Sequence, residues 1–349
     1  MIRFFRRLCI FPLLLVAVFP IAALAGETLR VLAWPGYADA DLVRAFEQRT
    51  GARVEVTLID SDDVMWQKIS RNKAADFDVF AVNTAELQRY IKQGLVVPID
   101  TGAIHNLATQ VARFHDLKAI PGLVHDGAVY AIPYTYSDMG LIYDRNQVKT
   151  PPDSITSLWD PRYSGKVLAY NGSTHNFSLA ALSLGRANPF HIADKDWPLM
   201  TRRLIALRRN VLTFYTEPSE SVDLFMGQHV ALLFANYGTQ QLKLLREAGA
   251  NVGYVIPREG ALAWLDCWAI TRSAHNRALA EAWIDYLLEQ APSMALVNRQ
   301  GLASTTTPSP DYRPGDRLIW LQPVEDVDRR SHLWERILSG YKFEKVMAQ

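Results

Sequence analysis

The chain has 349 residues, 49% of them hydrophobic, and 37 lysines and arginines stand against 36 aspartates and glutamates, a formal net charge of +1. This near-neutral balance argues against a nucleic-acid-binding protein, which needs a basic excess to displace counterions from phosphates, and against a highly charged disordered protein. At roughly 150 residues per domain, the length suggests about two compact domains.

The amino terminus has the composition of an export signal. A basic start is followed by an apolar run, residues 8–23, and by the small-residue motif Ala23-Leu24-Ala25, an order typical of secretory signal peptides. We predict that residues 1–25 are a signal peptide cleaved after Ala25 and that the mature protein is periplasmic. A retained membrane anchor is the alternative, but the run is shorter than the roughly 20 residues that a spanning helix needs, and Pro12 and Pro20 interrupt it.

Removal of the signal changes both the charge and the cysteine content. The mature chain keeps 34 basic and 36 acidic residues, a balance of −2, and one cysteine, Cys267. Cys9 stands ahead of most of the apolar run, which argues against a lipid-attachment site. A single cysteine cannot form a disulfide within the chain, so stability must come from hydrophobic cores. Cys267 lies between Asp266 and Trp268 in an apolar segment, and we expect it to be buried rather than reactive.

Strands and helices alternate along the mature chain. Apolar residues at every second position predict strands, and apolar residues that recur on one face before a glycine predict helices. In chain order the first elements are a strand at 28–33, a helix at 39–51, strands at 53–59 and 77–82, a helix at 84–93 and an extended segment at 95–99. The alternation implies an α/β fold with helices packed on a mostly parallel sheet.

A second series of elements begins after Pro133. Strands are predicted at 140–144, 166–170, 212–215, 231–235, 252–256 and 264–271, and helices at 176–184, 197–209, 219–226, 239–248, 276–288 and 291–300. The sequence has no repeats and no long linker, so two α/β lobes joined by short crossovers account for it best. Residues 133–137 and 256–260 are the crossover candidates, because each follows a predicted strand and contains a proline.

Sequence signatures of catalysis are missing. The chain has no H-E-x-x-H, G-x-S-x-G, Walker or G-x-G-x-x-G motif and no paired C-x-x-C. The eight histidines are scattered, and His105, His115 and His125 recur at a spacing that fits neither a helix face nor a zinc site. We therefore predict no catalytic residue, no metal site and no cofactor.

Aromatic residues near predicted strand ends are more informative. Trp34 and Tyr37 directly follow the first strand, at the carboxyl end where open α/β sheets place their ligands. Trp264 and Asp266 have the same parity on one strand, so both side chains point to one face. An indole beside a carboxylate suits an ammonium or guanidinium, through a cation–π contact and an ion pair. The alternative is that the tryptophans are core residues and Asp266 is a hydrogen-bond acceptor at a strand end.

Several of these segments, taken together, resemble the spermidine/putrescine-binding periplasmic proteins, within extracellular solute-binding protein family 1. The matching segments are Leu32-Ala33-Trp34-Pro35-Gly36-Tyr37, Phe77-Asp78-Val79, Gly94 to Asp100, Ala131-Ile132-Pro133-Tyr134, Ser157 to Lys166, and Pro257-Arg258-Glu259-Gly260 with Trp264 and Asp266. The resemblance implies a type II periplasmic-binding-protein fold, with two hinged lobes and a central ligand cleft. It also implies an ABC importer component that is not an enzyme. We expect one lobe to comprise residues 26–133 and 260–302 and the other residues 134–259 and 303–349.

The family's binding positions carry over only in part. Trp34, Tyr37, Trp264 and Asp266 match its aromatic box and its amine-binding carboxylate, and Asn83 stands where a small polar residue is usual. Where polyamine binders place acidic residues for the distal amine, this chain has Gly172 and His175, and Ala235 replaces an aromatic residue. Tyr134 and Asp138 complete the candidate set, Asp138 as a second anion. Because an unpaired buried charge is costly, a single matched carboxylate favours a ligand with one cationic end.

The functional hypothesis is a periplasmic carrier of a small amine of the putrescine or spermidine class, feeding an inner-membrane ABC permease. An amino acid or guanidino compound is the alternative ligand, because His175 suits a neutral or anionic group at the far end. The same fold could instead act as a ligand sensor for a membrane receptor. An exported enzyme has the least support, and Tyr134 with Tyr136 leaves a ferric or oxyanion carrier open. We expect a monomer that binds no nucleic acid.

Overall fold

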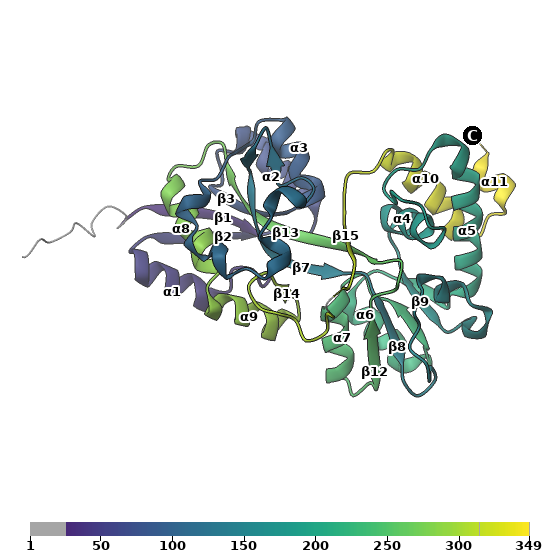
Figure 1. The fold of residues 1–349 in the computed structure, drawn as a ribbon. Helices are drawn as coiled ribbons and strands as arrows, with labels where there is room; N and C mark the ends of the chain where they lie inside the picture. The colour runs from purple at the N-terminus through teal and green to yellow at the C-terminus, as the bar shows by residue number, and fades with distance from the viewer. Residues whose placement is uncertain (1–25, 314, 349) are drawn as a thin grey trace, which may run out of the picture.

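The computed structural model describes residues 26–313 and 315–348. These residues form two lobes, each built around its own β-sheet (Figure 1). The predicted signal peptide and its cleavage after Ala25 lie outside the described residues. Within the described part of the chain, no helix has the length and apolar character needed to span a membrane.

The larger sheet has eight strands in the order β14-β7-β13-β3-β1-β2, with β4 and β15 also paired to β13. Strand β1 is parallel to β2 and β3, whereas β13 is antiparallel to β3 and β7. The sheet is therefore mixed, and the prediction of a mostly parallel sheet is wrong, because β13 returns from the other lobe and enters in the opposite direction. The strands are β1 (Thr28–Ala33), β2 (Arg53–Leu58), β3 (Val79–Asn83), β4 (Val96–Val97), β7 (Ala131–Asp138), β13 (Ala261–Thr271), β14 (Ala303–Ser304) and β15 (Leu318–Trp320).

Helices cover both faces of this sheet. Helices α1 (Ala40–Thr50), α8 (Arg277–Leu287) and α9 (Gln290–Gln300) pack against Val31 and Ala33 of β1 on one face. Helices α2 (Asp62–Ser70) and α3 (Thr84–Lys92) pack on the other face, against Leu32. Cys267 is fully buried in this second core, as the sequence predicted. Because both faces are covered, the central strands are apolar at consecutive positions.

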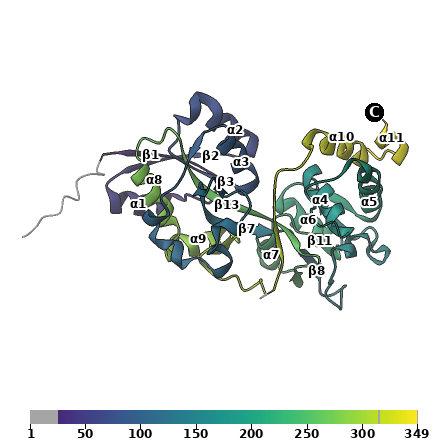
Figure 2. The same cartoon turned by 45° about the horizontal axis from the view of Figure 1, so that its top comes forward.

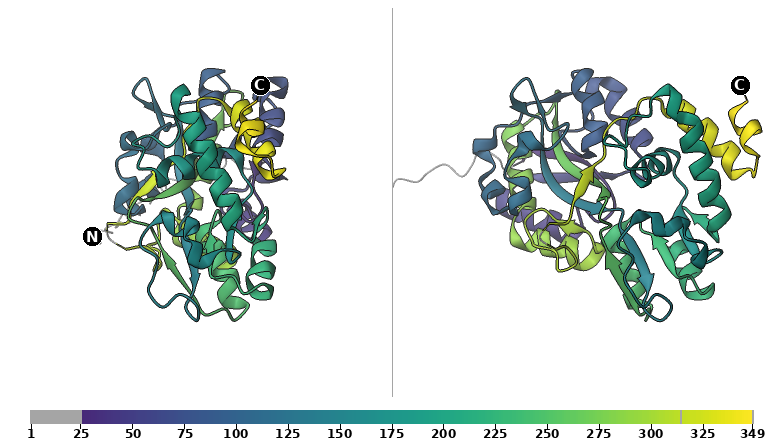
Figure 3. Two further views of the ribbon diagram at one scale, coloured as in Figure 1. Left: turned by 90° about the vertical axis from the view of Figure 1, so that its right-hand side faces the viewer. Right: turned by 45° about the vertical axis from the view of Figure 1, so that its right-hand side comes forward.

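The smaller sheet forms the second lobe, with five strands in the order β10-β9-β11-β8-β12. One face carries α4, α5, α10 and α11, and the other carries α6 and α7. In Figure 3 the yellow carboxyl-terminal helices lie along α5, on the outer side of this lobe. The elements are β8 (Leu141–Asp144), β9 (Val167–Tyr170), β10 (Thr213–Tyr215), β11 (Leu232–Phe234), β12 (Val252–Val255), α4 (Ser173–Ser183), α5 (Trp197–Asn210), α6 (Pro218–Gly227), α7 (Gly238–Glu247), α10 (Val327–Leu338) and α11 (Phe343–Met347). A two-stranded ribbon, β5 (Val124–His125) with β6 (Ala128–Val129), is separate from both sheets.

The chain passes between the lobes three times (Figure 2). Residues 133–137, predicted as a crossover, instead lie inside buried strand β7, because residues 131–138 pair with β13 on both sides of a bulge at Tyr134. The passage itself follows at residues 139–140. Residues 256–260 do connect the smaller sheet to β13, as predicted. The third passage, from β15 to α10, was not predicted. The lobe boundary expected between residues 133 and 134 falls within β7, and the predicted division into lobes stays a prediction.

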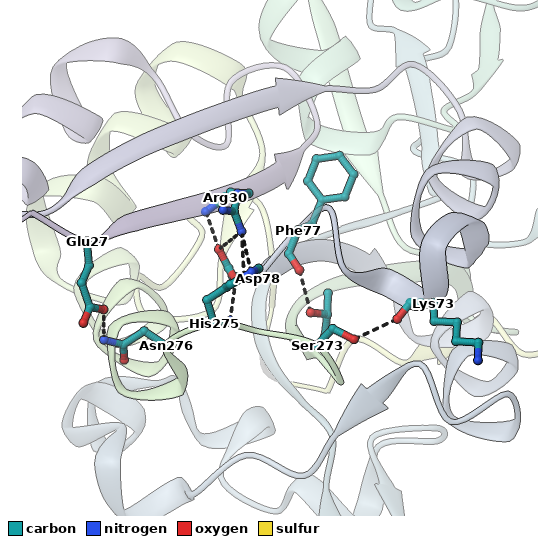
Figure 4. Close-up of polar contacts among 9 residues, drawn as sticks. Glu27, Arg30, Lys73, Phe77, Asp78, Ser273, His275 and Asn276 are labelled. Carbon is teal, nitrogen blue, oxygen red and sulfur yellow. Dashed lines mark hydrogen bonds and ion pairs between the residues drawn. The ribbon is translucent and has the colours of Figure 1, made fainter.

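A polar cluster holds together the amino-terminal ends of β1 and β3 (Figure 4). Asp78 is 1% exposed, and its carboxylate accepts hydrogen bonds from the main-chain N–H groups of Arg30 and His275, each at 2.8 Å. Thr271 donates from its hydroxyl to the main-chain oxygen of Phe77 at 2.7 Å. These bonds hold β1, β3 and the end of β13 together at the end of the sheet that is opposite the carboxyl ends of β1 and β3.

Candidate functional site

A buried pair of polar side chains joins the turn after β1 to β13. The Tyr37 hydroxyl donates to Oδ2 of Asp266 at 2.6 Å, and these residues are 3% and 7% exposed. The turn after β1 brings Tyr37 there, with a bond from its N–H to the main-chain oxygen of Trp34 at 3.2 Å. Gly36 in this turn has φ +84°, and a Cβ at that position would lie 2.3 Å from Gln300. The turn therefore needs glycine both for its backbone angle and for space.

Asn83 links this pair to an acidic residue that the sequence analysis did not consider. Asn83 ends β3 and lies directly opposite Asp266 in the β3–β13 ladder. Its side chain caps α3 by accepting from the N–H of Glu86 at 2.9 Å, and its amide donates to Oδ1 of Asp62 at 3.1 Å. Asp62 opens α2, just beyond the carboxyl end of β2. Three adjacent loops of the larger sheet thus converge on the Asp62–Asn83–Asp266 group.

The two carboxyl groups have unusual acidities. Burial raises the pKa of Asp266 to about 7, with a further rise from the charge of Asp62 and an opposing effect of the Tyr37 hydrogen bond. Burial also raises the pKa of Asp62 to about 6; the charge of Glu86 adds to this, and that of Arg89 opposes it. A cation placed between these groups would favour their ionised forms.

The two predicted tryptophans border the same region. Trp264 is on β13 two residues before Asp266, opposite Ser137 of β7, and packs against the cores of both lobes. Trp34 packs between the two helix layers of the larger sheet. Its buried indole N–H has no hydrogen-bond acceptor among the residues that the structure describes. Both side chains are only partly buried, unlike ordinary core tryptophans such as Trp268.

Tyr134 joins the group, whereas Tyr136 does not. The ladder between β7 and β13 has a bulge that passes over Tyr134, which packs edge-on against Tyr37 at a ring-centroid distance of 5.5 Å. Tyr136 packs in the core on the other face, against Phe114. The extra residue of a bulge shifts the alternation of the strand by one position. Tyr134 and Tyr136, the two residues on which the alternative of a ferric carrier rested, are therefore not brought together.

The structure places Asp138 away from Asp266. Asp138 lies opposite Ala263, whose side chain alternates with those of Trp264 and Asp266. Its carboxylate accepts from the Tyr254 hydroxyl, and it is fully buried. Burial raises the pKa of Asp138 to about 6. As a second anion for a ligand at Asp266, Asp138 faces the wrong side of the strand.

On the second lobe, the segment expected to hold a distal group begins helix α4. Gly172 is the N-cap residue, and the ring of His175 in the first turn lies tilted against that of Tyr170, with 5.6 Å between the ring centroids. Burial and, to a lesser extent, the charge of Arg330 lower the pKa of His175 to about 4. His175 is therefore neutral at neutral pH. It adds no positive charge against a cationic ligand.

Ala235 replaces an aromatic residue of the family, and this chain has an aromatic residue two positions later, at Tyr237. Ala235 is fully buried in the core. Tyr237 follows β11, donates its hydroxyl to the main-chain oxygen of Thr216 at 2.8 Å, and lies edge-on to Tyr170 at 5.8 Å. Both tyrosines stand at carboxyl ends of the smaller sheet, the position that predicted Trp34 and Tyr37 in the first lobe.

Nothing in the described residues assembles a metal centre. Across residues 26–313 and 315–348, no three His, Cys, Asp or Glu side chains are grouped so that they could hold a metal ion. The predicted site residues do not form one group. Six of them belong to strands of the larger sheet and the loops that follow: Trp34, Tyr37, Asn83, Tyr134, Trp264 and Asp266. His175 belongs to the second lobe, and Asp138 lies apart.

Comparison with known proteins assigns the fold and the family. The model of the bacterial extracellular solute-binding proteins matches residues 41–316. The chain belongs to this family. It is a solute-binding component of an ABC transporter and not an enzyme, as predicted. Members of this family act in the periplasm or outside the cell, which fits the coarse prediction of location.

Curated relatives and solved structures show how far this similarity extends. The chain is 23% identical over 328 residues to spermidine/putrescine-binding periplasmic protein 1 of Haemophilus influenzae, covering 92% of this chain and 88% of the relative. It is 28% identical over 287 residues to the putrescine-binding periplasmic protein PotF of Escherichia coli, covering 77% and 75%. The fold matches the substrate-binding protein PotD of Streptococcus pneumoniae with a TM-score of 0.74 at 20% identity, covering 92% and 99%. The predicted two-lobed α/β fold is confirmed.

Proposed function

We propose that this solute-binding protein carries a small organic amine, held between the lobes with an ammonium group at Asp266, and delivers it to an inner-membrane permease. The observation that supports this most is the state of Asp266, a carboxylate that is 7% exposed and hydrogen-bonded to Tyr37. No Lys, Arg or His side chain among the described residues forms an ion pair with it. A buried carboxylate without a counterion is costly, and a ligand cation would compensate it.

The aromatic surroundings suit the same ligand class. Trp34, Tyr37 and Trp264 offer ring surfaces to methylene groups and to an ammonium. The names of the relatives from Haemophilus influenzae and Escherichia coli describe binding of spermidine and putrescine, which supports an amine for this chain. The neutral His175 on the second lobe leaves an amino acid or guanidino compound as the alternative ligand.

Enclosure of the ligand requires the lobes to approach each other. Four cavities bordered by the described residues lie away from Tyr37 and Asp266; one of about 150 Å³ is at the back of the lobe junction, between α7 and residues 301–311. We propose that the lobes close around the amine by bending at the three chain passages, as hinge motions of two-domain binders do. The working unit is a monomer, and the export signal is cleaved after Ala25.

A binding experiment tests the amine. Ligand-stripped mature protein is titrated calorimetrically at pH 8 with 1,4-diaminobutane, agmatine and 4-aminobutanoate. We expect saturable binding of an amine, and a loss of affinity on the order of a hundredfold in Asp266→Asn, because the ligand then loses its ion pair. Asp223→Asn, an exposed change of equal charge on α6, is the matched control. Binding of 4-aminobutanoate alone would favour the amino-acid alternative, and unchanged amine affinity in Asp266→Asn would reject the role of Asp266.

A further inference from the structure

We propose that Asp62, the first residue of α2, is a second anionic contact of this site and gives the protein a preference for ligands with two cationic nitrogens. The inference rests on the proposed function. It adds a specificity-determining residue that lies outside the motifs by which the sequence resembles its family.

The contacts place Asp62 beside Asp266. The Asn83 amide donates to Oδ1 of Asp62 at 3.1 Å, and Asn83 is the direct cross-strand partner of Asp266. Directly paired residues in an antiparallel ladder have Cα atoms about 4.5–5.5 Å apart. Asn83 thus stands between the two carboxylates, and Tyr37 holds Asp266 from the other side. The four residues come from the loops after β1, β2 and β3 and from β13, which meet at the end of the sheet nearest the second lobe.

The charges around Asp62 leave it without a counterion. Asp63 is its neighbour on α2, and Glu86 and Arg89 face it from α3. The Arg89 guanidinium is used elsewhere. It forms an ion pair with Glu86 at 2.8 Å, donates to the main-chain oxygen of Asp62 at 3.1 Å, and lies over the ring of Trp66 at 4.4 Å. No basic side chain of the described residues forms an ion pair with the Asp62 carboxylate.

Two carboxylates in one partly dehydrated site resist ionisation together. Burial raises the pKa of both groups; the charge of Asp62 adds to the rise at Asp266, and the charges of Glu86 and Asp63 add to the rise at Asp62. One ammonium compensates only one of them. A ligand with two cationic nitrogens can compensate both, so its binding should draw both carboxyl groups into the ionised form and release protons near pH 7.

A purely structural role is the competing explanation for Asp62. Ser61 already caps α2, accepting from the N–H of Val64 at 3.3 Å. An acidic residue in the first turn also interacts favourably with the helix dipole. That role concerns folding alone and would not make the protein distinguish one amine from another. A ratio of affinities therefore separates the two explanations.

The experiment compares wild type, Asp62→Asn and Asp63→Asn. Asparagine at position 62 keeps an oxygen that can accept from Asn83, and Asp63 is the exposed neighbour of equal charge. Dissociation constants for 1,4-diaminobutane and 1-aminobutane are measured by calorimetry at pH 8. The diamine is repeated at pH 7 in two buffers of different ionisation enthalpy, which gives the number of protons released.

We expect wild type and Asp63→Asn to bind the diamine at least about tenfold more tightly than the monoamine, the order of magnitude of one charge-assisted contact. In Asp62→Asn that ratio should fall towards one, with monoamine affinity almost unchanged and fewer protons released. A preserved ratio in Asp62→Asn, or equal losses for both amines, would overturn the assignment. If wild type binds neither amine, the proposed function itself fails, and the two failures are distinguishable.

Discussion

At the scale of single residues, burial and the opposing hydrogen bond from Tyr37 together set the acidity of Asp266. Burial raises the pKa of Asp266 to about 7 in the ligand-free protein, and the Tyr37 hydroxyl opposes that rise. Because the folded-state pKa lies above that of the unfolded chain, the folded state binds more protons between about pH 4 and pH 7. Asp266 therefore destabilises the fold progressively as pH rises through that range, and a bound cation removes this penalty.

Replacing Tyr37 tests this account. In Tyr37→Phe the hydroxyl is lost, so the pKa of Asp266 should rise further above 7. At pH 7 the affinity for an amine should fall about tenfold, the usual effect of one hydrogen bond to a charged group. At pH 8.5 the loss should be smaller, because more of Asp266 is ionised. Calorimetric titration of 1,4-diaminobutane from pH 5.5 to pH 8.5 measures the profile, and affinity should decrease towards acid in both proteins.

Tyr134→Phe is the matched control for this change. Tyr134 packs edge-on against Tyr37 and is 2% exposed, but its hydroxyl has no hydrogen-bond partner among the described residues. The pH profile should therefore match that of wild type. An equal shift in both variants would mean that the loss of any buried hydroxyl at this place, rather than of the hydrogen bond to Asp266, controls affinity.

At the scale of elements, the Asp78 cluster holds the strands that carry the site. Asp78 bonds to the main chain of β1 and of the loop after β13 at one end of the sheet (Figure 4). Tyr37, Asn83 and Asp266 lie at or near the other end. The register of β1, β3 and β13 must be fixed for Asn83 to lie opposite Asp266. The cluster therefore stabilises the lobe without contributing to the binding surface.

Asp78→Ala should lower the free energy of unfolding by about 2–4 kcal/mol, because the N–H groups of Arg30 and His275 lose their acceptor. Urea denaturation measures this loss, and calorimetry on the folded protein should show nearly unchanged amine affinity. Asp76→Ala removes an exposed carboxylate that only accepts from Asn72, and it should cost less than about 0.5 kcal/mol. Equal losses in the two variants would contradict the role given to the buried cluster.

Most elements could be predicted from the sequence because their signals are local. Helices α1 and α3 are amphipathic and stop near Gly51 and Gly94, which adopt positive φ, and the buried strands are apolar runs of strand length. Helix α2 was not predicted because only Met65 and Ile69 of its nine residues are buried, which is too weak a pattern of apolar residues. The antiparallel entry of β13 depends on which lobe the chain is returning from, and no local pattern records that.

Strand alternation could predict the candidate site only where neighbours in sequence are also neighbours in space, whereas Asn83 and Tyr134 were predicted from the resemblance to the family. Trp264 and Asp266 could be paired by strand alternation, and their parity holds in the ladder with β7. The same rule fails in β7, where the bulge at Tyr134 places Asp138 on the other face. Asp62 was missed because its link to Asp266 runs through Asn83. The strands β2, β1, β3 and β13 must pair in that order before these residues meet.

At the scale of the whole molecule, contacts behind the lobe junction decide how far the lobes can move. Helix α7 of the second lobe begins against the end of β7. The Thr239 hydroxyl donates to the main-chain oxygen of Gly301, at the end of α9 in the first lobe, at 2.7 Å. Arg246 of the same helix forms an ion pair with Asp311 at 3.0 Å. Because these contacts join the lobes beside the chain passages, a closing motion would turn about them.

Gly238, at the start of α7, lies at the closest approach between α7 and β7; we call this contact the joint. Its φ is +47°, and a Cβ would lie 2.2 Å from Oγ of Ser137 and 2.4 Å from the main-chain oxygen of Asp138. The main chain of β7 cannot retreat, since it is paired with β13. Gly238→Ala should therefore push α7 away from β7, and cost roughly 2 kcal/mol of stability through overpacking and backbone strain. Gly249, just beyond the other end of α7, also has a positive φ of +83°, but a Cβ there would meet nothing within 4 Å. Gly249→Ala therefore measures the free-energy cost of the backbone angle alone.

Thermal unfolding and small-angle scattering with and without 1,4-diaminobutane measure both effects. In wild type and Gly249→Ala, saturating amine should reduce the radius of gyration as the lobes close. In Gly238→Ala the ligand-free radius should already differ, and the change on binding should be altered, because the point about which the lobes turn has moved. If Gly238→Ala matches Gly249→Ala in stability and scattering, the joint between α7 and β7 does not control closure, and the hinge must lie in the three passages alone.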